Sequence, residues 1–149
     1  MKTKIIVIAL FAMVASIAAS CQGVTSGRTE PWTQSQLLEP SALAKTINNP
    51  DAKQPIIFCV GPQAVIKNSI DIGPTRDKAN LDKLQARLEK LPKDADIVIY
   101  CGCCPFSRCP NVRPAFDLLN KMQFKNQKLL DLKQNVKVDW IDKGYPVGE

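Results

Sequence analysis

The strand-to-helix segment of this chain reads Ile97-Val98-Ile99-Tyr100-Cys101-Gly102-Cys103-Cys104-Pro105-Phe106-Ser107-Arg108-Cys109-Pro110-Asn111. Its apolar start predicts a buried strand over residues 96–100, and residues 112–122 have the apolar spacing of an amphipathic helix. Four cysteines therefore lie in one loop between a strand and the amino end of a helix. Free N–H groups and the helix dipole favour an anion at such a place, and a thiolate is an anion.

Apolar runs on either side of this loop predict the remaining elements. Strands are expected at residues 55–60, 70–72 and 128–132, and helices at residues 41–47 and 76–91. Pro40 lies near the start of the first helix and Pro92 follows the second. Because strands and helices alternate, the sequence predicts a single α/β domain, residues 32–149, with a mostly parallel central sheet and helices on both faces. In such sheets ligands bind beyond the carboxyl ends of the strands, where the cysteine loop falls.

The amino terminus has the pattern of an export signal. Two lysines precede an apolar stretch, residues 5–19, that is shorter than the roughly 20 residues a membrane-spanning helix needs. Small residues before Cys21 resemble a bacterial lipoprotein lipobox, so residues 1–20 are predicted to be a signal peptide and Cys21 the lipidated residue. Residues 21–31 are predicted to be a flexible tether. We expect the protein in the bacterial cell envelope, anchored to the membrane by its lipid and facing the periplasm; ordinary cleavage and release is the alternative.

Charge and cysteine content limit the classes of partner. Without the two lysines of the signal, 18 basic residues stand against 14 acidic ones, with both signs interspersed. Nucleic-acid-binding domains concentrate basic residues in a stripe, so we expect no nucleic-acid partner. An exported protein can form disulfides, but lipidation of Cys21 would leave five cysteines and therefore at least one unpaired thiol. Cys59, inside an apolar run, is predicted to be an inert core residue.

The order of elements and three segments resemble the rhodanese-like (sulfurtransferase) domain family. The segments are Pro55–Val60 followed by Ile66-Lys67-Asn68-Ser69-Ile70-Asp71-Ile72, the run Ile97–Tyr100 into Cys101, and the closing Trp140 with Gly144-Tyr145-Pro146-Val147. The resemblance extends from Trp32 to Val147 and implies a rhodanese-like fold. In that family the cysteine after this strand takes a sulfane sulfur from a donor such as thiosulfate, as a persulfide, and passes it to a thiol or cyanide. By position, the resemblance assigns this role to Cys101.

The other loop residues are candidate partners of Cys101. The N–H groups of the loop, with Gly102 and Ser107 as substrate-binding residues, are predicted to hold a small sulfur donor. Arg108 and Arg113, the cations in or just after the loop, are predicted to pair with a sulfonate-like group on it. The cysteines that receive the sulfur, or release it by forming a disulfide, are predicted to be Cys104, Cys103 and Cys109. The expected partners are thus a small sulfur donor or a thiol acceptor, with no cofactor and no bound metal.

Other interpretations of the cysteines stay open. Cys101 and Cys104 have the C-x-x-C spacing of thiol–disulfide exchange proteins, which predicts a redox role. A disulfide such as Cys104 with Cys109 would pin a long loop in an exported protein. Four thiolates within nine positions could also hold Zn²⁺ or Cu⁺, although the adjacent Cys103 and Cys104 would rarely both reach one ion. With locked disulfides or a bound metal, the domain would be a non-catalytic module.

Overall fold

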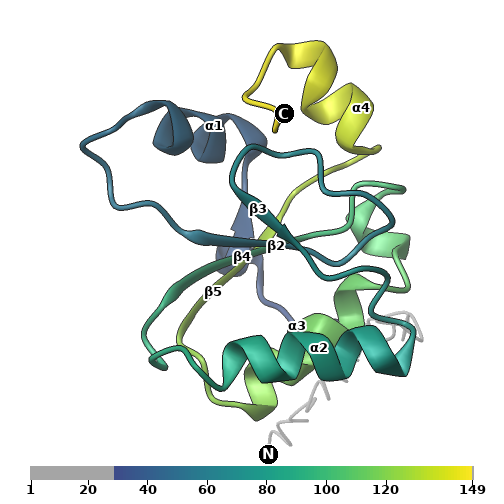
Figure 1. Cartoon of the computed structure of the whole chain (residues 1–149). Helices are drawn as coiled ribbons and strands as arrows, with labels where there is room; N and C mark the ends of the chain where they lie inside the picture. The colour runs from purple at the N-terminus through teal and green to yellow at the C-terminus, as the bar shows by residue number, and fades with distance from the viewer. Residues whose placement is uncertain (1–28, 149) are drawn as a thin grey trace, which may run out of the picture.

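The computed structural model describes residues 29–148, so the predicted signal peptide, Cys21 and most of the predicted tether lie outside the described residues. The chain forms an α/β domain around a five-stranded sheet in which every neighbouring pair of strands is parallel. The strand order is β1-β5-β4-β2-β3 (Figure 1). The strands are β1 (Leu37–Leu38), β2 (Ile56–Cys59), β3 (Ser69–Asp71), β4 (Asp96–Tyr100) and β5 (Asn126–Leu130). The predicted α/β domain with a parallel sheet is confirmed.

Helices cover both faces of the sheet. They are α1 (Pro40–Asn48), α2 (Lys78–Leu88), α3 (Val112–Lys121) and α4 (Val136–Asp139), with 3₁₀ turns at Gln34–Gln36, Phe106–Arg108 and Ile141–Lys143. Figure 1 shows α2 and α3 on one face, and α1 and α4 on the other. Alternate residues of β4 enter the two cores: Ile97 and Ile99 join the core under α2 and α3, while Val98 and Tyr100 join the core under α1. Because both faces are buried, β4 has a continuous apolar sequence.

Two strands differ from the expectation by more than a residue at one end or the other. β5 runs from Asn126 to Leu130 and not over residues 128–132, because its pairing with β4 begins where Asn126 lies opposite Asp96. Because Asn126 and Gln127 are polar, the start of β5 does not stand out in the sequence as part of an apolar run. β1 was not predicted at all, since two residues are too few to show any periodicity.

The folded part of the chain begins before the predicted domain boundary. Arg113 donates to the Glu30 carboxylate at 2.5 Å, and the Asn120 side chain donates to the Pro31 carbonyl at 2.6 Å. The last residues of the predicted tether are therefore held against α3. Within residues 29–148, no helix is long and apolar enough to cross a membrane.

Candidate active site

Cys101 lies at the carboxyl edge of the sheet, directly after β4, the middle strand of the five. Its side chain belongs to the core under α2 and α3, and the residue is only 3% exposed. Cys109, just before α3, is fully buried, whereas Cys103 is exposed and Cys104 is half-buried. All five cysteines in the described part of the chain are unpaired thiols. Within the loop, the Cys103 thiol is thus exposed to solvent, whereas the Cys101 and Cys109 thiols are buried.

A tight turn at Gly102 brings Cys103 back over Cys101. Gly102 has φ +87°, a conformation that favours glycine, and its carbonyl accepts the N–H of Val136 at 2.9 Å. The Cys103 sulfur then lies 3.2 Å from that of Cys101, while the Cys104 sulfur lies 3.4 Å from that of Cys103. The thiol next to Cys101 along the loop is therefore Cys103, and not its C-x-x-C neighbour Cys104.

Helix α4, which the sequence analysis missed, supplies the Val136 N–H that holds this turn. The helix begins after Asn135, whose side-chain oxygen accepts the N–H of Val138 at 3.0 Å and so caps the amino end. A β-carbon on Gly102 would lie 3.1 Å from the Val136 side chain. The short helix and the glycine therefore fit together closely and fix the position of Cys103.

The amino end of α3 affects Cys109 directly and Cys101 only indirectly. The backbone N–H groups of Asn111 and Val112 hydrogen-bond the Cys109 sulfur, and the Cys109 side chain in turn hydrogen-bonds Cys101. The sulfurs of Cys101, Cys103 and Cys109 all lie within 4.8 Å of one another. The helix terminus was expected to stabilise a thiolate on Cys101, but it reaches that sulfur through the Cys109 thiol.

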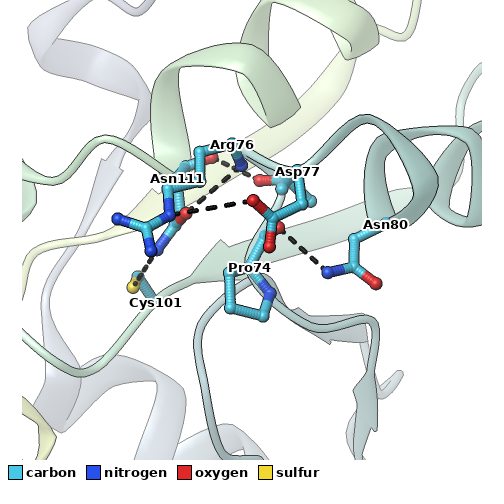
Figure 2. A network of polar contacts seen from close by, with 7 residues as sticks. Pro74, Arg76, Asp77, Asn80, Cys101 and Asn111 are labelled. Carbon is cyan, nitrogen blue, oxygen red and sulfur yellow. Dashed lines mark hydrogen bonds and ion pairs between the residues drawn. The ribbon is translucent and has the colours of Figure 1, made fainter.

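Asn111 connects Cys101 to the loop after β3, as Figure 2 shows. The buried Asn111 side chain donates from Nδ2 to the Cys101 sulfur at 3.3 Å and accepts the backbone N–H of Arg76 on Oδ1 at 3.2 Å. Its carbonyl accepts the Thr75 hydroxyl at 2.5 Å. Because the N–H of Arg76 occupies the amide oxygen, the NH₂ group is directed at the sulfur. The sequence analysis did not predict Asn111 as a site residue, although its position just before a predicted helix could have indicated a role.

These contacts give the clustered thiols different acidities. Hydrogen bonds from the Cys109 side chain, the Asn111 amide and the Cys103 N–H lower the pKa of Cys101 to about 5, against the opposing effect of burial. Partial desolvation and the hydrogen bond to Cys101 raise the pKa of Cys103, and the hydrogen bond to Cys101 and burial raise the pKa of Cys109. These shifts favour the thiolate on Cys101 over a thiolate on Cys103 or Cys109.

This difference predicts a specific titration. In protein labelled with ¹³C at the cysteine β-carbons, the Cys101 signal is expected to move through its thiol–thiolate change near pH 5, while the Cys103 and Cys109 signals stay in the thiol state at neutral pH. In Asn111→Asp the sulfur loses a donor and gains a neighbouring anion, so the Cys101 midpoint moves to higher pH. Cys101→Ser assigns the signal. A Cys101 midpoint near pH 9 in the wild type would contradict the arrangement described.

The two arginines of the predicted donor site have different surroundings. Arg113 donates to the carbonyls of Cys109 at 3.1 Å and Ser107 at 2.6 Å as well as to Glu30, and its guanidinium lies 5.4 Å from the Trp32 ring. Its hydrogen bonds hold the loop to the amino-terminal segment. Arg108 and Ser107 are exposed in the 3₁₀ turn. Of the two predicted cations, Arg108 is the more exposed.

The loop after β2 forms the floor beneath Cys101. At Gly61, an added β-carbon would overlap the carbonyl oxygen of Cys101 and lie 2.8 Å from its sulfur. The fully buried Cys59 donates to the Gln63 carbonyl at 3.2 Å, and burial raises its pKa. Cys59 is thus a core thiol, as predicted. Gly61 is a part of the site that the sequence analysis did not single out, although the glycine follows a strand at the same sheet edge.

In comparisons with known proteins, no family model, no curated protein and no solved structure matches this chain.

Proposed function

We propose that the protein is a rhodanese-like sulfurtransferase that carries sulfane sulfur as a persulfide on Cys101. The observation that carries the proposal is the setting of one buried sulfur: the Asn111 amide donates to it at 3.3 Å, and the Cys103 sulfur lies 3.2 Å from it. This sulfur lies at the carboxyl edge of a parallel sheet, the edge where such folds bind ligands. The resemblance of the strand and loop sequences to the rhodanese-like family supports the same activity.

In the first step, the Cys101 thiolate attacks the outer sulfur of a donor such as thiosulfate. A bond forms between the Cys101 sulfur and the transferred sulfur, the S–S bond of the donor breaks, and sulfite leaves with the electron pair. The product is a persulfide anion on Cys101. The negative charge of the persulfide lies on its outer sulfur, where the N–H groups of the loop are proposed to stabilise it. Arg108, exposed in the loop, is the proposed partner for the donor's negative charge.

In the second step, Cys103 carries the sulfur to the surface. The Cys103 sulfur bonds to the outer sulfur of the persulfide, the bond to Cys101 breaks, and Cys101 returns to the thiolate; the Cys103 proton moves to the new persulfide. The distance of 3.2 Å between the two sulfurs supports this exchange. Because Cys103 is exposed, a bulky external thiol acceptor would meet the sulfur there, whereas a donor as small as thiosulfate is the one proposed to reach the buried Cys101.

Peptide-mapped mass spectrometry tests the proposal. The reduced full chain, in a Cys21→Ser background, is incubated with thiosulfate and digested without reductant. We expect one added sulfur on the peptide that contains Cys101, together with one sulfite released per chain. Protein that gains no sulfur and releases no sulfite, under conditions in which it remains folded, would contradict the proposal.

The close approach of Cys101 and Cys103 also supports a second function, thiol–disulfide exchange. In this case Cys101 attacks a disulfide of a partner, one partner thiolate leaves, and Cys103 then displaces the second partner thiolate by bonding to Cys101. The domain ends oxidised and the partner reduced. The same mass spectra distinguish the two functions, because this reaction removes two hydrogens from the loop peptide and adds no sulfur.

A further inference from the structure

We propose that Cys101, Cys103 and Cys109 form a binding site for a soft, thiophilic metal ion, with Cu⁺ as the ion that fits best. The sequence predicts no bound metal, because the adjacent Cys103 and Cys104 would rarely both bind one ion. The structure combines other cysteines: one from the end of β4, one from the Gly102 turn and one from the start of α3. The inference stands independently of the sulfurtransferase proposal.

The spacing of the three sulfurs suits a metal ion. With a metal–sulfur distance of about 2.3 Å, three sulfurs in a plane around an ion are about 4 Å apart. In the structure all three lie within 4.8 Å of one another, and the sulfurs of Cys101 and Cys103 are 3.2 Å apart. Cys103 is exposed, so its side chain is free to open by the remaining fraction of an ångström. The two other residues, Cys101 and Cys109, are buried.

The chemistry of the site selects the ion. The chain contains no histidine, and the three candidate ligands are all sulfur. Sulfur-only sites favour soft ions, and Cu⁺ accepts three ligands readily, whereas Zn²⁺ normally takes four. Binding releases the protons of the coordinating thiols to the buffer. The Asn111 amide and the N–H groups of Cys103, Asn111 and Val112, which hydrogen-bond the sulfurs, would orient them and offset the negative charge of three thiolates.

Bound metal would also block the proposed sulfur transfer. The Cys101 electron pair that attacks the donor would be engaged in the bond to the ion. Metal-loaded protein is therefore expected to take up no sulfur from thiosulfate, and removal of the ion is expected to restore uptake.

Competition with a chromogenic chelator tests the site. The reduced full chain, in a Cys21→Ser background and without oxygen, is titrated into the Cu⁺ complex of bicinchoninate. We expect the protein to remove one Cu⁺ per chain. Cys103→Ser should weaken binding by about a hundredfold or more, because loss of even an indirect support of a metal site costs about 10–100-fold. Cys104→Ser is the matched control, since it removes the adjacent thiol of the same loop and should leave the affinity unchanged.

Two results would overturn the inference. One is a wild-type protein that removes no Cu⁺ from the chelator; the other is equal loss of affinity in the Cys103 and Cys104 variants, which would indicate unspecific binding to exposed thiols. Cys103 is the informative position because it is exposed, so its replacement should leave the fold intact, whereas the buried Cys109 carries a risk of misfolding.

A parallel titration with Cd²⁺, followed by sulfur-to-cadmium absorption, should give three thiolates in the wild type and two in Cys103→Ser. If the protein binds neither Cu⁺ nor Cd²⁺, the metal site is excluded. The sulfurtransferase proposal is not, because sulfur loading from thiosulfate is measured separately.

Discussion

Cys101→Ser is expected to abolish sulfur loading completely. The hydroxyl that replaces the thiol stays protonated at neutral pH, and oxygen does not form a persulfide, so the donors around position 101 no longer surround a nucleophile. The substitution removes no methylene group and is nearly isosteric, so the protein should remain folded. The measurement is the mass of each cysteine peptide after incubation with thiosulfate, with sulfite release as an independent readout.

The neighbouring cysteines provide the controls for this variant. Cys104→Ser should load sulfur at the wild-type level, because the Cys104 sulfur contacts Cys103 and not Cys101. Cys103→Ser should load Cys101 but deliver the sulfur to an added thiol more slowly, since the surface carrier is missing. If Cys101→Ser still gains sulfur on any loop peptide, the nucleophile is a different cysteine and the proposed order of transfer is wrong.

Gly61→Ala is expected to damage both the fold and the site. The new β-carbon would overlap the Cys101 carbonyl and press on its sulfur. The backbone has little freedom to retreat, because the N–H of Val60 binds the Tyr100 carbonyl at 2.8 Å and the Val60 carbonyl accepts the N–H of Thr75. Overpacking of this kind costs about 1–3 kcal/mol, and here the atoms in conflict are backbone atoms, so we expect the upper part of that range.

Urea unfolding and thiosulfate loading measure the two effects separately. We expect a lower unfolding midpoint for Gly61→Ala, and about tenfold slower loading even where the variant is fully folded, because Cys101 must shift away from its donors. Gly148→Ala is the matched control, since a β-carbon there meets its nearest neighbour at 3.8 Å, an ordinary contact. Equal midpoints and equal loading rates for the two variants would show that the floor under Cys101 is not tightly packed.

Much of the fold was predictable because β4 and α3 carry strong patterns. β4 matches the predicted range, residues 96–100, and α3 begins at the predicted Val112. Both elements bury broad apolar surfaces, so their sequences show the spacing of their secondary structure. β1 and α4 were missed because they are very short: their positions depend on contacts with distant residues, which a local pattern does not contain.

The site was predictable only in part, for a similar reason. The position of Cys101 follows from the strand before it. The choice of Cys103 over Cys104 as its neighbour depends on the backbone conformation of Gly102, which spacing alone does not reveal. The contribution of Asn111 depends on the N–H of Arg76, brought from another loop by the fold. Arg113 looked available in the sequence, but the carbonyls of its own loop and Glu30 engage it.

The alternation of Tyr100 and Cys101 limits how the length of this region can change. Tyr100 lies in one core, where its hydroxyl accepts the N–H groups of Val65 and Ile66, and Cys101 lies in the other. One residue inserted within β4 would exchange the two side chains between the cores, placing a phenol where the thiolate belongs. Insertions and deletions of one residue should therefore be rejected within β4 and before Cys103.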